Sequence, residues 1–296
     1  MDVLSPAIAA TRTGRPRAFR IEGGERWGRR FDPVAGAAFH TVRLGSCWLI
    51  SAHDKPLQLA AGDIVLLPHG SGHGLADSPD KALLDLDQVP ADSDAPATTV
   101  VVSGQYLLDQ GRPHPLLSEL PETVHLPVGK GALQPQLQGA ADLLGRELED
   151  AGQGADAAVP ALMDVLLLYI LRAWYAQQPC VETEVGWGTA LRDPTLSAIL
   201  AGIHRSPERA WTVDAMAAES GLSRTSFARR FNEVIGQPPL AYLTWWRMMT
   251  AARMLRDSDL PLAAVARRVG YSSEFAFANA FKREYGIAPG KYRQAT

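Results

Sequence analysis

The sequence has few of the features of secreted, membrane or disulfide-bonded proteins. Only two of its 296 residues are cysteines, so no disulfide framework is expected and a reducing compartment suits the chain. The N-terminus carries no apolar signal core. No apolar run reaches the length of a membrane span, because the longest, around Leu162–Leu171, is interrupted by Asp164 and followed by Arg172. We therefore expect a cytoplasmic protein with no membrane partner.

The excess of charge is also small, but it is unevenly distributed. The chain carries a net charge of −3, with 46% hydrophobic and 21% charged residues, as in a folded protein. From Thr195 to the C-terminus there are 14 Lys and Arg against 8 Asp and Glu, whereas the preceding residues carry 15 against 24. This asymmetry is expected of a nucleic-acid-binding module joined to a domain that does not bind nucleic acid.

The sequence does contain a repeated pattern near its C-terminus. Thr212–Phe231 and Pro261–Phe281 each give a short helix with an apolar face, a glycine turn and a serine opening a second helix. In both, the second helix closes on Phe-x-x-x-Phe. This is the pattern of a helix-turn-helix, written twice. In the first copy Gly221 turns the chain, Leu222 is expected to pack beneath the turn and Ser223 to cap the second helix.

The two second helices predict different outward faces. With both phenylalanines of each helix directed inward, helical spacing directs three side chains outward in each copy. Arg229 suits guanine, Asn279 suits adenine, and Phe275 suits a thymine methyl group, if these helices lie in the major groove. Arg224 and Arg230 lie on the flanks, where phosphate contact is more natural; alternatively the second helix only positions the protein on phosphate. The outward residues are Thr225, Arg229 and Asn232 in the first copy, and Phe275, Asn279 and Lys282 in the second.

Between the copies, Pro238–Arg256 predicts one long helix with apolar residues toward both. A continuous helix would hold the two reading helices rigidly. If they enter successive major grooves on one face of DNA, their separation is about 34 Å.

The N-terminal half has a sequence pattern typical of β structure. Short apolar runs separated by Gly, Pro, Asp and Ser predict an antiparallel sandwich or barrel. Residues 1–30 contain seven arginines and predict either a basic arm that contacts DNA phosphate or an irregular lead-in with one edge strand. The expected strands lie at Ala38–Leu44, Cys47–Ala52, Asp63–Leu67, Ala82–Leu86 and Thr98–Leu108.

One segment of this half, Gly62–His73, resembles the second motif of the cupin barrels, G-x5-P-x-G-x2-H. Gly62, Pro68, Gly70 and His73 match in register, with Asp77 where the motif would end in Asn. The first cupin motif, which supplies H-x-H and a Glu in metal enzymes, is not matched: Val42 follows His40 and no Glu stands at the expected distance.

Two roles for the barrel follow from these residues. We predict an effector site that includes His40, Trp48 and His73, with no cofactor and no enzymatic activity. The alternative is a metal-dependent cupin enzyme with an appended DNA-binding domain, in which His40, Cys47 and His73 hold the ion. The missing acidic ligand argues against that alternative.

Two helices are expected after the barrel, at Pro135–Asp150 and Val159–Gln177. The second is too apolar for one contact face, so we expect it to pair with a second copy of the chain; burial wholly within its own domain is the alternative. Gln178–Asp193 is polar and predicts a linker. The expected domains are therefore 1–177 for sensing and dimerisation, 178–193 as linker and 194–296 for DNA binding.

The C-terminal third resembles the AraC/XylS transcription regulators. The resemblance rests on G-L-S with F-A-R-R-F at 221–231, the A-A-R-M-L end of the long helix, and F-K-R-E-Y-G-I-A-P-G-K-Y-R at 281–293. It implies an α+β chain, with a cupin-like barrel and two helices followed by an all-α double helix-turn-helix domain. It also implies double-stranded promoter DNA, a small effector and RNA polymerase as partners. An activator is the expectation, and a repressor is the alternative that the sequence leaves open. The base-contact positions that the resemblance implies are Thr225, Ala228, Arg229, Glu274, Phe275, Ala278 and Asn279.

Overall fold

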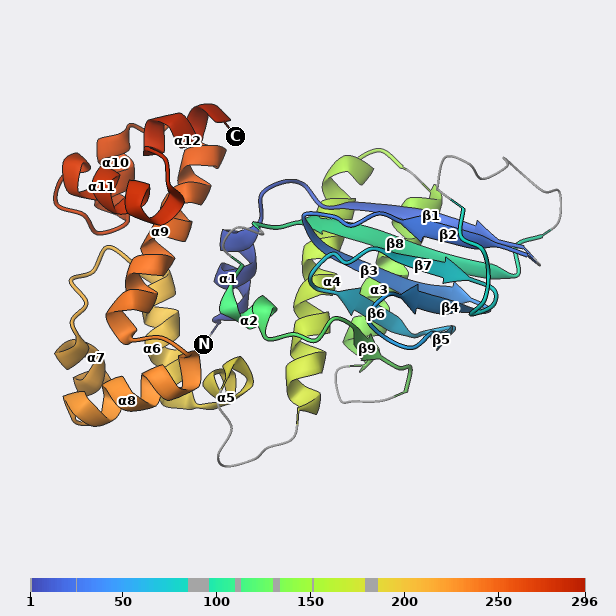
Figure 1. Cartoon of the computed structure of the whole chain (residues 1–296), viewed down its shortest axis with the longest axis horizontal. Coiled ribbons are helices and arrows are strands. Elements are labelled where there is room, and N and C mark those ends of the chain that lie inside the picture. Colours follow the sequence, from blue (N-terminus) through green and yellow to red (C-terminus); the bar gives the residue numbers. More distant parts are fainter. Residues whose placement is uncertain are drawn as a thin grey trace. The chain divides into compact units, whose positions relative to one another are not determined.

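The computed structural model of the chain contains two compact units, which are described separately. One comprises Gly14–Pro113 and Leu117–Pro179; the other comprises Met1–Thr13, His114–Leu116 and Cys180–Thr296. Figure 1 shows the elements of both units. The domain limits expected from the sequence stay a prediction, and the contacts add two segments from earlier in the chain to the DNA-binding unit. The structure describes residues 2–24, 26–84, 96–109, 113–129, 134–150, 152–178 and 186–295.

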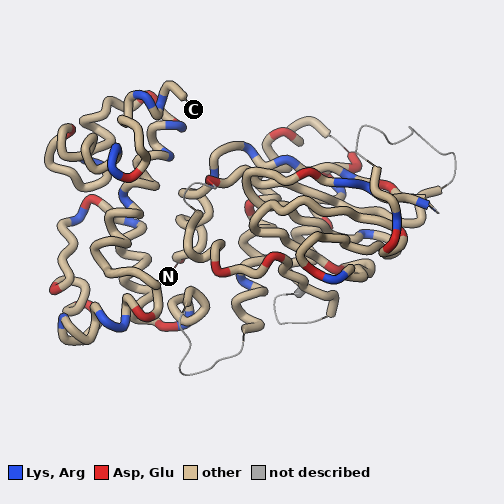
Figure 2. Tube along the Cα trace, viewed as in Figure 1, with Lys and Arg blue, Asp and Glu red and all other residues tan. Residues whose placement is uncertain are grey.

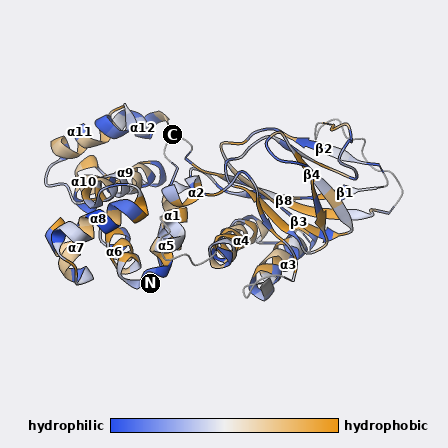
Figure 3. Ribbon diagram, turned by 60° about the horizontal axis from the view of Figure 1, so that its bottom comes forward, coloured by the Kyte–Doolittle hydropathy of each residue, from blue (hydrophilic) through white to orange (hydrophobic). Residues whose placement is uncertain are grey.

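The first unit is built on two antiparallel sheets. The larger has the strand order β1-β8-β3-β6-β9 and the smaller the order β2-β7-β4-β5. Hydrophobic residues are concentrated along the central strands β3 and β8 (Figure 3). Alternate residues of the strands form the core between the sheets, as expected for sandwiches. The strands are β1 Arg17–Gly23, β2 Gly28–Phe31, β3 Gly36–Leu44, β4 Ser46–Ser51, β5 Leu57–Ala60, β6 Ile64–Leu67, β7 His73–Ala76, β8 Thr99–Leu107 and β9 Val124–Leu126.

Four of the five expected strands are confirmed, as β3, β4, β6 and β8. The expectation for Ala82–Leu86 is wrong in its described part. Only Leu84 pairs there, in an isolated bridge with Arg29, and the residues after Leu84 lie outside the described ranges. Apolar composition alone gave this segment a strand pattern, but its described part pairs with β2 at Leu84 only, which is too short for a strand.

Two helices, α3 (Gln134–Asp150) and α4 (Ala155–Gln177), pack against each other and against β1. Both were expected from the sequence. The Tyr106 hydroxyl, on β8, donates a hydrogen bond of 2.7 Å to the Met163 carbonyl of α4. Contrary to the expectation that no segment could span a membrane, α4 is long and apolar enough to do so by length and composition. Core helices of other proteins meet the same criterion, and seven α4 side chains are buried here.

The second unit is helical. Its helices are α5 Trp187–Arg192, α6 Pro194–Arg205, α7 Val213–Ser220, α8 Arg224–Ile235, α9 Pro239–Asp257, α10 Leu262–Arg268, α11 Glu274–Tyr285 and α12 Pro289–Ala295. Helix α5 lies within the expected linker and buries Trp187 completely, so the polar composition of 178–193 concealed an element of this unit. The remainder of the expected linker, 179–185, lies outside the described residues.

Two segments from earlier in the chain, Met1–Thr13 and His114–Leu116, complete this unit. Helix α1 (Leu4–Thr11) packs against α6 and α9, and Arg256 of α9 donates a hydrogen bond of 3.0 Å to the Arg12 carbonyl. At the start of α2 (Pro115–Ser118), the His114 ring lies 4.7 Å from the Trp187 ring. The expectation of an irregular lead-in at 1–30 is therefore wrong, although β1 is the expected edge strand.

Candidate functional site

The first repeated pattern folds as a helix-turn-helix. Helix α7 ends at Gly221, whose φ of 68° is in the left-handed region that glycine adopts without a steric cost. The Ser223 hydroxyl accepts a hydrogen bond of 3.2 Å from the Ser226 N–H and so caps α8. Phe227 and Phe231 are fully buried, as expected. Leu222 was expected to pack beneath the turn but is 39% exposed, because the turn leaves its side chain toward solvent.

The second pattern repeats these local structures. Helix α10 leads to Gly270, with a φ of 82°, and the Ser273 hydroxyl accepts a hydrogen bond of 3.1 Å from the Ala276 N–H at the start of α11. Phe277 and Phe281 are fully buried in a core with residues of α9 and α10. Both expected helix-turn-helix units are therefore present, and α9 connects them as one helix.

The expected base-reading side chains lie on the exposed faces of α8 and α11. Basic residues lie at both ends of the first half of α8, at Arg224 and at Arg229 and Arg230, whereas those of α11 lie together in its last turn, at Lys282 and Arg283 (Figure 2). Ala228 and Ala278 are half-buried, and Phe275 is 78% exposed, the most exposed large hydrophobic side chain among those described. A single exposed apolar side chain is common on a protein surface, but Phe275 stands on the face of α11 that is expected to meet base edges, where an aromatic ring suits a thymine methyl group. The exposed members of the expected set are Arg224, Thr225, Arg229, Asn232, Glu274, Phe275, Asn279 and Lys282.

The arginines of α8 have different partners. Arg229 lies 3.9 Å from Glu233 and Arg224 lies 3.3 Å from Asp214, and both pairs are exposed, so water screens them strongly. Arg230 instead donates a hydrogen bond of 3.1 Å to Asp193, whose side chain is 10% exposed and caps α6. Arg230 is therefore tied into the fold, whereas Arg229 is available to a ligand.

The Asp193 carboxylate shows how this tie is stabilised. Burial works to raise its pKa, but hydrogen bonds from Arg230 and from the Leu196 and Thr195 N–H groups outweigh burial and lower the pKa. The signal in the sequence was Asp before Pro194, the pattern of an N-cap, although the partner on α8 could not be read from it.

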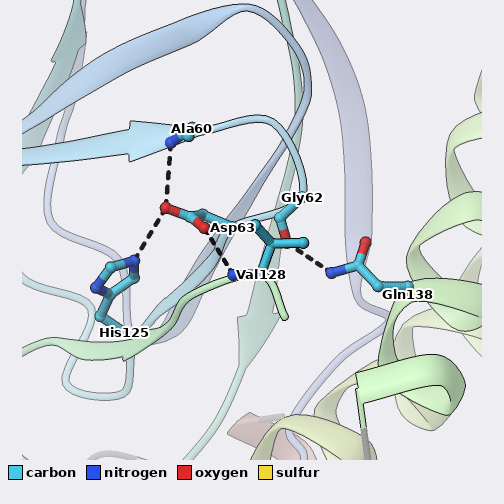
Figure 4. Close-up of polar contacts among 6 residues, drawn as sticks. All are labelled: Ala60, Gly62, Asp63, His125, Val128 and Gln138. Carbon is cyan, nitrogen blue, oxygen red and sulfur yellow. Dashed lines mark hydrogen bonds and ion pairs between the residues drawn. The ribbon is translucent and has the colours of Figure 1, made fainter. Parts of the chain in front are cut away.

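The segment that resembles a cupin motif is a turn, a strand and a second turn. Gly62 and Gly70 have φ values of 93° and 65°, and a Cβ at Gly70 would lie 2.2 Å from the Val34 carbonyl oxygen. Asp63 accepts hydrogen bonds from the Ala60 N–H (3.1 Å), the Val128 N–H (2.8 Å) and His125 (3.2 Å), as Figure 4 shows. The motif thus anchors the barrel wall, and the Asp63 contacts could not be predicted, because Val128 and His125 lie far along the chain.

The two histidines of the barrel meet between the sheets. The Nε2 atoms of His40 and His73 are 2.7 Å apart, and both side chains are almost fully buried. His73 Nδ1 lies 2.8 Å from the Ser71 carbonyl and must donate to it, so His73 Nε2 accepts from His40. His40 Nδ1 then accepts from the Ser103 hydroxyl, at 2.7 Å. This fixes both tautomers with neutral rings.

The environment of the pair favours these neutral rings. Burial lowers the pKa of His40 well below its usual value, and His73 lowers it further. Burial also lowers the pKa of His73, partly offset by the hydrogen bond to Ser71. The Phe31 ring stacks on His73 at 4.9 Å with an interplanar angle of 9°. Ser103 and Phe31 were not identified from the sequence, because they come from strands distant along the chain, and Ser71 was not identified because it contributes only its backbone carbonyl.

These residues do not fit a resident metal ion. Two nitrogens bound to one tetrahedral ion at about 2.0–2.1 Å would be separated by roughly 3.3 Å, more than the observed Nε2 separation. Burial raises the pKa of the Cys47 thiol to about 12, and the Asp63 charge adds to this, which opposes the thiolate that a metal requires. Within the described ranges, no three His, Cys, Asp or Glu side chains gather as a ligand set.

Trp48 is not brought to the histidine pair. Its neighbours Cys47 and Leu49 belong to the core between the sheets, and side chains alternate along a strand, so Trp48 lies on the opposite face of β4. Of the expected effector residues His40, Trp48 and His73, only the two histidines lie together between the sheets.

The chain was compared with protein families and with known proteins. Residues 2–176 match the family described as "Cupin", and residues 216–295 match the family described as "Helix-turn-helix domain". A putative AraC-like transcription regulator of Streptomyces antibioticus is 32% identical over 99% of both chains. The transcriptional regulator AlkR of Acinetobacter baylyi is 30% identical, again over 99% of each. A solved DNA-binding domain of AdpA, in complex with a target DNA, is 34% identical over 35% of this chain and 92% of that one, with a TM-score of 0.33.

Proposed function

The chain belongs to the AraC-like transcriptional regulators, and on that premise we propose that it reads an asymmetric DNA site under the control of a small effector bound in its barrel. One observation carries the proposal: α8 and α11 share a scaffold but expose different side chains. Thr225, Arg229 and Asn232 suit one set of base edges, whereas Phe275 and Asn279 suit another. Two different readers in one chain favour two different base patterns.

The histidine pair supports the barrel as the effector site. It supplies buried hydrogen-bonding groups, with Ser103, within an interior that is otherwise apolar. An effector controls DNA binding only if it favours one of two states of the chain, through the dimer or through the linker. We further propose that the chain acts in the cytoplasm as an activator that contacts RNA polymerase, as the family resemblance implies.

Selection of bound sequences from a pool of randomised duplexes tests the proposed site. The full-length protein is expected to enrich one site with two dissimilar blocks of bases, their centres about 34 Å, or one helical turn, apart. Enrichment of a repeated block would contradict the asymmetry. Affinity that ignores sequence would instead indicate a protein that coats DNA.

Helix α4 supports a homodimer. Its exposed and half-buried residues recur at alternating intervals of four and three, the spacing with which one helix packs along another. The Val165 side chain is 41% exposed, and Leu143 of α3, the helix that packs against α4, is 57% exposed. A second copy of α4 would cover this stripe through one self-complementary surface. The stripe consists of Ala158, Leu162, Val165, Tyr169 and Arg172.

Val165→Arg is expected to weaken the dimer at least about 100-fold, because it places a charge at the centre of an apolar contact, a loss of roughly 3 kcal/mol. Sedimentation velocity over a range of concentrations measures it. Val128→Arg is the matched control, since Val128 is 48% exposed in the same unit and is not part of the α4 stripe. If both variants dimerise like the wild type, the interface lies elsewhere.

A further inference from the structure

Arg247 lies near the middle of α9, the helix that connects the two helix-turn-helix units. Its side chain is half-buried rather than directed into solvent. Nε donates a hydrogen bond of 2.8 Å to the Pro207 carbonyl, and Nη2 donates one of 2.9 Å to the Arg209 carbonyl. Both acceptors belong to the loop between α6 and α7. Arg247 therefore ties α9 to the chain that enters the first helix-turn-helix.

That loop is itself held firmly. Trp211 Nε1 donates a hydrogen bond of 2.9 Å to the Ser206 carbonyl, and the Arg209 guanidinium lies 4.2 Å above the Trp211 ring. Arg209 also forms an ion pair of 2.6 Å with Glu219 on α7. A displacement of the loop would thus be transmitted to α7 and, through its turn, to the reading helix α8.

The Arg247 guanidinium also lies against the second helix-turn-helix. A Cβ added at Gly270 would be 2.5 Å from Arg247 Nη2 and 3.0 Å from Glu208 Cα. Gly270 forms the turn before α11. The guanidinium therefore fills the space between the loop that enters the first helix-turn-helix and the turn of the second helix-turn-helix. Only glycine leaves room for this contact, and its φ of 82° also disfavours other residues.

The surroundings compensate the buried charge. Burial lowers the pKa of Arg247, while Tyr271 and Glu208 work to raise it. Two carbonyl acceptors match the planar fork of a guanidinium, which holds its donors in fixed directions. Lysine would bring a charge to the same place, but it has no such fork and could not hold both carbonyls in the same geometry.

We propose that Arg247 is a positioning residue that fixes the separation of α8 and α11, and thereby the number of base pairs between the two blocks of bases that they read. The inference rests on the proposed reading of DNA by both helices. Arg247 contacts loop 207–209 and the Gly270 turn, and its role requires no contact with DNA.

The test uses the full-length protein and the duplex enriched from randomised DNA by the wild type. A series of duplexes carries one or two base pairs added or removed between the two blocks. The wild type is expected to lose about tenfold or more in affinity for each altered spacing, because one block is then misaligned. Arg247→Ala should bind all spacings within about threefold of one another, and Arg247→Lys, which keeps the charge and most of the packing, should lie between.

Arg253→Ala, which removes another arginine of α9, is the control and should keep the wild-type preference. A uniform loss of affinity with an unchanged ratio between spacings, in Arg247→Ala and Arg247→Lys, would indicate mere stabilisation and overturn the proposal. Should Arg247→Ala unfold, the lysine variant decides alone. Equal binding of every spacing by a sequence-specific wild type would also overturn the proposal but leave base reading intact, whereas no preferred sequence at all would overturn both.

Discussion

Phe231→Ala is expected to lower the stability of the DNA-binding unit by about 3–5 kcal/mol and to abolish specific DNA binding. The Phe231 side chain is fully buried, with its ring centroid 5.6 Å from that of Phe227 and 5.9 Å from that of Tyr242. It therefore joins α8 to the long helix α9. Its removal leaves a cavity at the contact that orients a reading helix. Loss of this size is a large part of the stability of a domain.

Thermal unfolding followed by circular dichroism measures the effect, and a fall in Tm of more than about 10 °C is expected. Phe275→Ala is the matched control, because Phe275 is 78% exposed on α11, the corresponding helix of the second helix-turn-helix. Its Tm should stay close to that of the wild type. Its DNA affinity should fall instead, most for sites with thymine opposite Phe275. Equal losses of Tm in both variants would show that Phe275 is structural.

The contrast between these phenylalanines indicates which features of the structure can be predicted from the sequence. Helical periodicity placed Phe227 and Phe231 inward and Phe275 outward, because a helix repeats its own geometry whatever packs against it. The N-cap serines and the glycine turns were likewise local signals, and both helix-turn-helix units are as predicted. The family resemblance extended the same inference to the whole C-terminal unit.

Features that depend on distant contacts were less predictable. Helix α1 packs against α6 and α9, which begin only at Pro194 and Pro239, and its eight residues have no periodic signal of their own. The alternation of β4 was readable, but which of its faces lies between the sheets was not, so Trp48 was grouped with two histidines that lie on the other side of its sheet. Arg247 and Asp193 act through carbonyls and side chains that only the fold brings near. The charge and spacing of residues along the chain do not identify such partners.

Arg229→Ala is expected to remove most of the preference for one operator while leaving weaker, salt-sensitive binding. The Arg229 side chain is 75% exposed and its ion pair with Glu233 is weak, so little free energy opposes its transfer to a base edge. One bidentate contact with guanine provides about 1–3 kcal/mol of discrimination, so the ratio of specific to non-specific affinity should fall by roughly 5–150-fold. Competition titrations with operator and unrelated duplexes measure this ratio.

Variants of two other arginines of α8 distinguish the recognition of bases from sequence-independent binding to phosphate. Arg224→Ala should weaken binding to all sequences alike and reduce the slope of log K against log salt by about one, as expected for the loss of a phosphate contact. Arg230→Ala removes an arginine adjacent to Arg229 that is held by Asp193, so it should lower Tm more than specificity. If Arg229→Ala kept the wild-type preference for the operator, Arg229 would not read a base, and α8 would derive its specificity from Thr225 and Asn232.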